Sequence, residues 1–292
     1  MQKHSASLIA IILVTALIGH GQTAKPPIKT DSLKFAVIGD NGTGSKEEYQ
    51  IAEQMVRARQ QYPFAFVLML GDNLYGSVSP KEFVKKFEKP YKGLLDLGIK
   101  FYAALGNHDD PARQISYEKF NMGGKKYYTF KPRNGVRFFA LDSNYMDRKQ
   151  LEWLETELKN SGSEWKIVYF HHPIYSSGEK HGSNVELRST LEPVLVKYGV
   201  DVVLAGHEHF YERIKPQKGI HYFILGSSGK LRRGNIGTTG LTAKGFDQDN
   251  AFMLADIEGD RMSFQVMTRS GKTVDAGNIT RAEKTRQVAA PR

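Results

Sequence analysis

Seven nearly continuous apolar runs constrain the fold of this chain more than any other feature of its sequence. Strands buried on both faces have such runs, whereas strands with one solvated face alternate apolar and polar residues. Helical patterns lie between several of the runs, and strands that alternate with helices are typical of an α/β fold. The runs are residues 35–38, 64–70, 101–105, 136–141, 165–170, 200–205 and 222–225.

Four helices are expected between these runs, because three have a recognisable start signal and the fourth has a recognisable stop. Ser45 and Glu48 have the spacing of a capping box, and Pro80 follows Ser79 where proline commonly begins a helix. Gly199 is the expected stop of the last helix. The three start signals are at Ser45, Ser79 and Asp147, and the fourth helix is expected over residues 185–198.

Two hairpins are expected beside the helix-connected strands. Residues 251–257 and 262–268 flank a Glu-Gly-Asp turn, and residues 127–130 and 136–141 flank an Arg-Asn-Gly turn. Short turns of this kind join antiparallel strands. We therefore expect an α/β domain in which two mixed β-sheets pack face to face, with helices flanking them.

An apolar run of 11 residues, 8–18, lies near the start of the chain. A membrane-spanning helix needs about 20 residues, so this run is too short to be one. Small and polar residues follow it, and the whole pattern is typical of a secretory signal peptide over residues 1–24. Cleavage after Gly21 and cleavage after Ala24 both fit. We expect a periplasmic or secreted mature protein without a transmembrane anchor.

The rest of the chain divides into three parts. We interpret residues 25–33 as an N-terminal linker and residues 34–280 as a single folded domain, a size that one α/β domain commonly has. Residues 281–292 are basic and nearly free of large apolar groups, so we expect a flexible tail.

Composition limits the chemistry and the partners. The chain has no cysteine, so thiolate metal sites are excluded and any metal must have oxygen and nitrogen ligands. Its formal charge is +10, with the cations spread along the chain among acidic residues. This charge favours a small anionic substrate. No aromatic-plus-basic motif indicates a specific nucleic acid, and the oligomeric state is left open.

Five short polar motifs each follow an apolar run directly. In open α/β sheets, ligands bind beyond the carboxyl ends of the strands, so these motifs are expected to meet there. They supply carboxylates, an amide, a phenol and imidazoles, which are ligands that a hydrolytic metal site uses. The motifs are Gly39-Asp40-Asn41-Gly42, Gly71-Asp72-Asn73-Leu74-Tyr75, Gly106-Asn107-His108-Asp109, Val168-Tyr169-Phe170-His171 and Gly206-His207-Glu208-His209.

The types of ligand fit a site with two metal ions. Two ions about 3.5–4 Å apart can clamp the attacking and the leaving oxygens of an in-line displacement. A carboxylate can bridge two ions because it has two oxygens, and Asp40 and Asp72 are both candidates. His207 and His209 can serve two different ions, or one ion if the backbone turns. Gly206 allows the chain to approach the metals closely.

In their order and identity, these motifs resemble the metallophosphoesterases, and specifically the purple (tartrate-resistant) acid phosphatases. The resemblance extends from about Lys34 to about Thr268 and is strongest to the small single-domain enzymes, whereas residues 206–213 resemble the plant enzymes more. It implies that residues 34–280 are a metallophosphoesterase catalytic domain. It also implies Fe(III) together with a second divalent ion, which is Fe, Zn or Mn.

The resemblance implies a role for each matching residue. Tyr75 would be the phenolate ligand of the ferric ion, and Asp72 would bridge the two ions. His108 and His181 would contact the substrate phosphate and help to protonate the leaving group. His172 beside His171 would be structural or would support the ligands from outside. The implied metal ligands are Asp40, Asp72, Tyr75 and His209 for the first ion, and Asn107, His171 and His207 with the bridging Asp72 for the second.

The expected function is therefore that of a secreted acid phosphatase. It would hydrolyse phosphate monoesters by in-line attack of a metal-bound hydroxide at a dinuclear Fe(III)–M(II) centre, with an acidic optimum because a ferric ion is a strong Lewis acid. The alternative is a phosphodiesterase or nucleotide hydrolase of the same superfamily that uses two Mn or Zn ions. A non-catalytic anion- or metal-binding protein is an alternative from another class.

Three cations follow the last apolar run. Lys230, Arg232 and Arg233 come shortly after the predicted strand at residues 222–225. One hypothesis is that they line the mouth of the site and attract an anionic substrate. A solvated loop without a function is the alternative.

Overall fold

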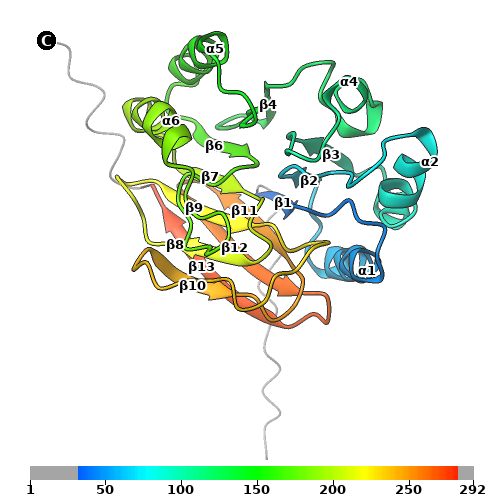
Figure 1. Cartoon of the computed structure of the whole chain (residues 1–292). Helices are drawn as coiled ribbons and strands as arrows, with labels where there is room; N and C mark the ends of the chain where they lie inside the picture. The colour runs from blue at the N-terminus through cyan, green and yellow to red at the C-terminus, as the bar shows by residue number, and fades with distance from the viewer. Residues whose placement is uncertain (1–31, 282–292) are drawn as a thin grey trace, which may run out of the picture. The chain divides into compact units, whose positions relative to one another are not determined.

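A computed structural model describes residues 32–281 of the chain, so the predicted signal peptide, most of the predicted linker and most of the predicted tail lie outside the described residues. The described residues form two mixed β-sheets with helices beside them, which confirms the predicted fold class (Figure 1). Among them, no helix is long and apolar enough to cross a membrane.

The six-stranded sheet combines a parallel and an antiparallel half. β1, β2 and β3 are parallel to one another, and the predicted C-terminal hairpin, β11 and β12, joins them through an antiparallel pairing of β11 with β1. The strand order is β13-β12-β11-β1-β2-β3. Its strands are β1 (Leu33–Ile38), β2 (Phe66–Met69), β3 (Lys100–Ala103), β11 (Ala251–Glu258), β12 (Arg261–Thr268) and β13 (Thr273–Thr280).

The seven-stranded sheet has four parallel strands in its middle. These are β5, β6, β7 and β9, and the antiparallel strands β4, β8 and β10 flank them in the order β10-β8-β9-β7-β6-β5-β4. The strands are β4 (Tyr128–Arg133), β5 (Val136–Ala140), β6 (Trp165–Phe170), β7 (Val202–Ala205), β8 (Tyr211–Ile214), β9 (His221–Leu225) and β10 (Thr242–Phe246).

The helices lie beside both sheets. Figure 1 shows α5 and α6 on the side of β6 and β7, and α1 on the side of β1. All four predicted helices are present, although α2 is only one turn long and passes into a π-helix. The short elements α3, α4 and the 3₁₀ turn were not predicted. The bounds are α1 (Lys46–Gln61), α2 (Pro80–Phe83), the π-helix Val84–Glu88, α3 (Lys92–Leu95), α4 (Pro111–Gln114), the 3₁₀ turn Glu118–Phe120, α5 (Arg148–Lys159) and α6 (Val185–Lys197).

The core lies mainly between the two sheets. Phe35 on β1 meets Phe138 on β5 edge to face, with ring centroids 5.2 Å apart, and both rings are fully buried. Phe66 on β2 makes a second edge-to-face contact with Phe138 at 5.4 Å. A separate apolar cluster joins the seven-stranded sheet to α5 and α6, through Leu154 and Leu191 among others. Burial on both faces explains why the central strands read as continuous apolar runs.

The capping box at the start of α1 is only half formed. The hydroxyl of Ser45 accepts the amide of Glu48, as predicted. The carboxylate of Glu48 instead accepts the backbone amides of Thr43 at 3.0 Å and Gly44 at 2.6 Å. It therefore holds the loop that follows Asp40. Burial raises the pKa of Glu48 to about 8, despite these amide donors.

This raised pKa gives a first prediction for stability. The folded chain holds a proton on Glu48 up to about pH 8, whereas the unfolded carboxyl releases it near 4.5. The stabilising contribution is thus complete below about pH 4.5 and is lost as the pH rises toward 8. We expect Glu48→Gln to remove this loss. The free energy of urea unfolding, measured across that range, should fall more steeply with pH in the wild type than in Glu48→Gln, and parallel curves would contradict the assignment.

Candidate metal centre

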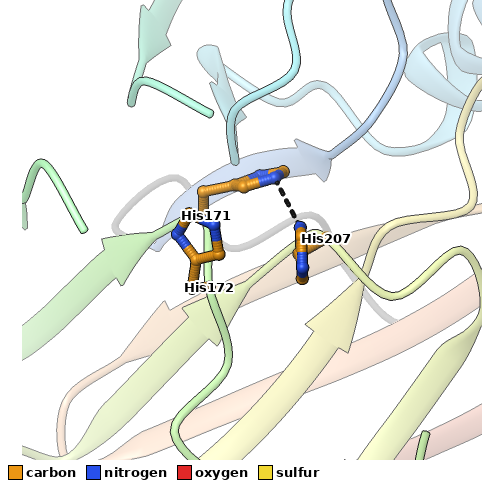
Figure 2. Close-up of side chains that lie close together, drawn as sticks. All are labelled: His171, His172 and His207. Atoms are coloured by element: carbon orange, nitrogen blue, oxygen red, sulfur yellow. Dashed lines mark hydrogen bonds between the residues drawn. The ribbon is translucent and has the colours of Figure 1, made fainter. Parts of the chain in front are cut away.

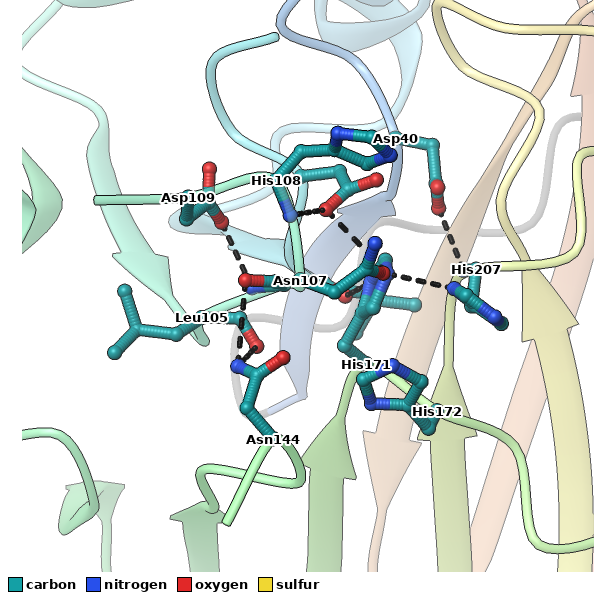
Figure 3. A network of polar contacts seen from close by, with 12 residues as sticks. Asp40, Leu105, Asn107, His108, Asp109, Asn144, His171, His172 and His207 are labelled. Carbon is teal, nitrogen blue, oxygen red and sulfur yellow. Dashed lines mark hydrogen bonds and ion pairs between the residues drawn. The ribbon is translucent and has the colours of Figure 1, made fainter. Parts of the chain in front are cut away.

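The predicted ligands follow the carboxyl ends of parallel strands. Asp40 follows β1, Asp72 follows β2, Asn107 follows β3, His171 follows β6 and His207 follows β7, each within four residues of the end of its strand. The first three strands belong to one sheet and the last two to the other. The site is therefore built where corresponding ends of the two sheets come together (Figure 3).

Three of these residues have an unusual backbone conformation. Asp40, Asp72 and His207 have φ of 52°, 53° and 68°, in the left-handed region that residues other than glycine rarely adopt. Each such residue costs free energy that the surrounding structure must offset, and such strain gathers at functional sites. The turns direct the three side chains toward one place rather than along the strands.

Glycines allow these turns to pack closely. A Cβ atom on Gly106 would lie 2.2 Å from the Oδ1 atom of Asp72, and one on Gly206 would lie 2.6 Å from the Oδ2 atom of Asp40. Neither distance leaves room for a side chain. The close approach expected at Gly206 is thus present, and Gly106 has the same role beside the other carboxylate.

One group of side chains combines carboxylates, a phenol and an imidazole. Ligand atoms of Asp40, Asp72 and His209 lie within 4.8 Å of one another. The hydroxyl of Tyr75 donates to Oδ1 of Asp40 at 3.0 Å and lies 3.3 Å from Nε2 of His209. The ammonium of Lys86, from the π-helix, donates to the backbone carbonyl of Tyr75 at 2.5 Å and so fixes the loop.

A second group is rich in nitrogen. Ligand atoms of His171, His172 and His207 lie within 4.8 Å of one another (Figure 2). Nδ1 of His171 lies 3.0 Å from the carbonyl of Leu70, which can only accept, so Nδ1 carries the proton and Nε2 has the lone pair. This Nε2 lies 3.0 Å from Oδ1 of Asn107 and 3.1 Å from Nδ1 of His207 (Figure 3). Several electron-rich atoms converging on one point fit a cation.

Asp72 is the carboxylate that reaches both groups. Its Oδ1 atom lies 3.4 Å from Nε2 of His171 in the second group, and Asp72 is also a member of the first group. The same oxygen accepts the backbone amide of His108 at 3.0 Å. Asp40 differs, since its Oδ2 accepts the backbone amide of His207 at 2.8 Å. Asp72, rather than Asp40, is therefore the carboxylate whose side chain lies between the two groups.

The charges of the site are poorly balanced by the protein alone. Burial raises the pKa of Asp40, and the neighbouring Asp72 carboxylate raises it further. Burial lowers the pKa of His207 to about 2 and that of His209 to about 4. Imidazoles that stay neutral keep the lone pair that a metal requires. Buried carboxylates beside neutral imidazoles are stabilised by a bound cation, so the donor set fits a metal.

The two predicted substrate-contacting residues lie on different sides of the site. The exposed ring of His108 lies 5.0 Å from the ring of Tyr75, in the first group. The ring of His181 lies 4.4 Å from that of His207, in the second. Burial lowers the pKa of His181, and the nearby Arg232 lowers it further. A substrate bound between the two groups would therefore have an imidazole on each side.

His172 has a partner of its own. Its Nδ1 lies 3.0 Å from the hydroxyl of Ser143, which also accepts the backbone amide of His172 at 3.0 Å. The hydroxyl therefore has its proton free for Nδ1, and Nε2 of His172 carries the ring proton. The ring lies 4.5 Å from that of His207. This arrangement suits a side chain that supports the site.

The three cations after β9 have different surroundings. The ammonium of Lys230 lies 4.4 Å from the centre of the Tyr75 ring, within the range of a cation–π contact. The guanidinium of Arg232 lies 3.7 Å from the buried carboxylate of Glu208. Arg233 is exposed. The hypothesis of one cationic mouth therefore applies best to Lys230.

A buried polar network that the sequence analysis did not identify holds two ligand loops together. Asp109 accepts the amides of Leu74 at 3.1 Å and Gly106 at 2.8 Å, so it ties the Asp72 loop to the Asn107 loop. Gln114 and Asn73 complete its contacts. Asp109 is part of a predicted motif, but nothing in the sequence indicated that its partner would be a loop rather than a metal.

Comparison with known proteins identifies the class. Residues 33–211 match the family described as Calcineurin-like phosphoesterase. The chain is 30% identical over 279 residues to Purple acid phosphatase 17 of Arabidopsis thaliana, with 82% of each chain covered. It is 28% identical over 262 residues to Tartrate-resistant acid phosphatase type 5 of Oryctolagus cuniculus, with 76% of this chain and 79% of the relative covered.

A solved structure supports the fold. A purple acid phosphatase from yellow lupin (Lupinus luteus) seeds matches with a TM-score of 0.69 at 18% identity, over 86% of this chain and 54% of that chain. The site and the matches define a metal-dependent phosphoester hydrolase. The chain belongs to the calcineurin-like phosphoesterase family, and it is similar to purple and tartrate-resistant acid phosphatases. The family resemblance inferred from the motifs is thereby confirmed.

The geometry predicts how metal content responds to substitution. If Asp72 serves both groups, Asp72→Ala should lose most of both ions, whereas His209→Ala should lose mainly the ion of the first group. His172→Ala should retain both, because its Nδ1 is engaged with Ser143. Metal analysis of the purified proteins after gel filtration measures this, with circular dichroism as a control for folding. Full retention of both ions by Asp72→Ala would rule out a shared ligand.

Proposed function

We propose that this protein is an acid phosphatase that hydrolyses phosphate monoesters at a dinuclear Fe(III)–M(II) centre, in which M is Fe, Zn or Mn. The observation that supports this most is the position of Tyr75. Its hydroxyl lies within 3.3 Å of both Asp40 and His209, so a phenolate there can share one metal ion with a carboxylate and an imidazole. Hard oxygen ligands of this kind suit a ferric ion.

We propose that each of the two groups of side chains binds one of the two ions. Asp72 would be shared, since its carboxylate reaches members of both. When bound, the ions would supply Lewis-acid polarisation and would neutralise charge on the phosphoryl oxygens. We assign Asp40, Asp72, Tyr75 and His209 to the ferric ion, and Asp72, Asn107, His171 and His207 to the divalent ion.

The remaining chemistry belongs to side chains around the ions. His108 and His181, on opposite sides, would hydrogen-bond the phosphate oxygens of a bound monoester. A protonated imidazole among them would donate its proton to the leaving alkoxide oxygen. Lys230 beside Tyr75 would add a positive charge near the bound phosphate. An activity optimum well above neutral pH would contradict the ferric assignment.

A phosphodiesterase or nucleotide hydrolase with two Mn or Zn ions is the alternative on the same scaffold. Tyr75 favours the phosphatase, since a phenolate ligand is of most use to a ferric ion. Turnover of 4-nitrophenyl phosphate and of bis(4-nitrophenyl) phosphate by one metal-loaded preparation separates the two functions. A preference for the bis-ester would favour the alternative, and absence of turnover of both would favour a non-catalytic binding protein.

We also propose that the protein is periplasmic or secreted. The support comes from the sequence alone, in the short apolar run at residues 8–18 followed by small and polar residues. N-terminal sequencing of the protein recovered from outside the cytoplasm would identify a cleavage site after Gly21 or after Ala24. Recovery of an intact N-terminus would contradict the proposal.

The visible spectrum tests the proposed ferric–phenolate ligation. The purified, iron-replete protein should have a visible charge-transfer band, and Tyr75→Phe should abolish it while iron is retained. Tyr102→Phe is a matched control, because this half-buried phenol stacks on Phe130 away from the ligands. A colourless wild type with bound iron would instead favour the Mn- or Zn-type alternative.

Lys230 gives a prediction on substrate binding. Lys230→Gln should raise KM for an anionic phosphomonoester several-fold and change kcat less, because it removes one positive charge beside the site. The effect should shrink as ionic strength increases. Arg233→Gln is the control, since it removes a charge from an exposed position. Equal KM values for Lys230→Gln and the wild type would refute this role.

A further inference from the structure

We propose that Glu208 is a positioning residue for His181, an inference that rests on the proposed phosphatase function. Glu208 lies between His207 and His209 in sequence, yet its own side chain points away from solvent and is fully buried. A buried carboxylate is costly unless donors or charges surround it. The partners of this carboxylate therefore indicate its purpose.

Two of these partners belong to the segment that carries His181. Oε1 of Glu208 accepts the backbone amide of His181 at 3.2 Å and that of Gly182 at 2.7 Å. Hydrogen bonds from backbone amides to a carboxylate are among the stronger ones. They fix the peptide on both sides of the His181 Cα atom, so they limit where its imidazole can lie.

The segment also packs directly onto the carboxylate. A Cβ atom on Gly178 would lie 2.1 Å from Oε1 of Glu208 and 2.3 Å from its Cδ atom. Residues 178–182 thus wrap around the Glu208 side chain, and only a glycine at position 178 permits this contact. Gly182 has φ of 70°, which turns the chain away after His181.

Arg232 completes the arrangement from the other side. Its guanidinium lies 3.7 Å from Oε2 of Glu208, and its backbone amide donates to the carbonyl of His209 at 2.8 Å. The positive charge of Arg232, whose backbone is held by the carbonyl of His209, therefore compensates the buried carboxylate of Glu208. Of the three cations that follow β9, Lys230 lies over Tyr75, whereas Arg232 pairs with Glu208.

The beginning of the same segment has a separate anchor. Glu212, also fully buried, accepts the backbone amide of Ser177 at 3.0 Å, and the amide of Glu179 donates to the carbonyl of Asn235 at 2.9 Å. Loss of Glu208 would therefore release residues 180–182 while the earlier residues stay attached. The expected defect is a misplaced His181, rather than an unfolded segment.

Under the proposed function His181 is one of two donors to the leaving oxygen, and the displacement of a donor affects substrates unequally. The alkoxide of an alkyl phosphate is a poor leaving group and needs a proton, whereas 4-nitrophenolate leaves readily without one. The ring of His181 lies 4.4 Å from that of His207, so a small displacement moves it away from the reacting phosphate. Glu208 should therefore matter more for alkyl than for aryl substrates.

The test compares kcat/KM for glycerol 2-phosphate and for 4-nitrophenyl phosphate in metal-loaded proteins of equal metal content. Glu208→Ala should lower the value for the alkyl ester at least about tenfold more than that for the aryl ester, which lies within the usual contribution of a general acid. Glu208→Gln keeps an acceptor oxygen for the two amides and should recover most of the difference. Glu164→Ala removes a carboxylate at the opposite end of β6, paired with Arg137, and should show no such selectivity.

A double-mutant comparison and hydrogen exchange complete the test. In a His181→Ala background, Glu208→Ala should have little further effect on the alkyl ester, because both changes remove the same function. Peptides that span 178–182 should exchange amide hydrogens faster in Glu208→Ala than in the wild type. Equal losses on both esters, multiplicative effects or unchanged exchange would each overturn the inference. Inactivity of the wild type on both esters would instead overturn the proposed function, and exchange would still test the Glu208 contacts.

Discussion

The rest of this structure depends on two buried carboxylates. Asp40 and Asp72 are almost completely removed from water, and the Asp72 carboxylate adds to the effect of burial in raising the pKa of Asp40. Backbone amides offset part of this cost, since His108 donates to Asp72 and His207 donates to Asp40. The imidazoles nearby stay neutral and contribute no positive charge. A fold that keeps such a pair is thus adapted to a cation rather than to its own stability.

The position of the pair explains several features that otherwise look unrelated. Because parallel strands from both sheets end at one place, five loops must meet there without colliding. Left-handed turns at Asp40, Asp72 and His207 direct their side chains into this place, and glycines such as Gly106 let the turns touch. Two further carboxylates accept hydrogen bonds from backbone amides of these loops and hold the loops together. Asp109 joins the loop of Asp72 to the loop of Asn107. Glu208, in the loop that follows β7, holds the segment that carries His181.

Much of this could be predicted from the sequence, and the failures have physical reasons. Central strands were recognised because burial on both faces leaves continuous apolar runs. β10 and β13 were missed because they are largely exposed edge strands with polar sequences. The ligand loops were recognised because their chemistry is distinctive and local. Glu208 and Lys230 were harder, since their partners lie 27 and 155 positions away in the sequence, and spacing carries no information about such contacts.

The two groups of side chains differ in charge, and this difference supports the proposal that they bind two unlike ions. The first offers the carboxylates of Asp40 and Asp72 together with the phenol of Tyr75. Burial and both carboxylates raise the pKa of that phenol, so only a strongly charged ion would hold it as a phenolate near neutral pH. The second offers imidazoles and the amide of Asn107, with Asp72 as its one anionic member. Fewer negative charges there are consistent with the proposed divalent ion, and the phenol of the first group is consistent with the proposed trivalent ion.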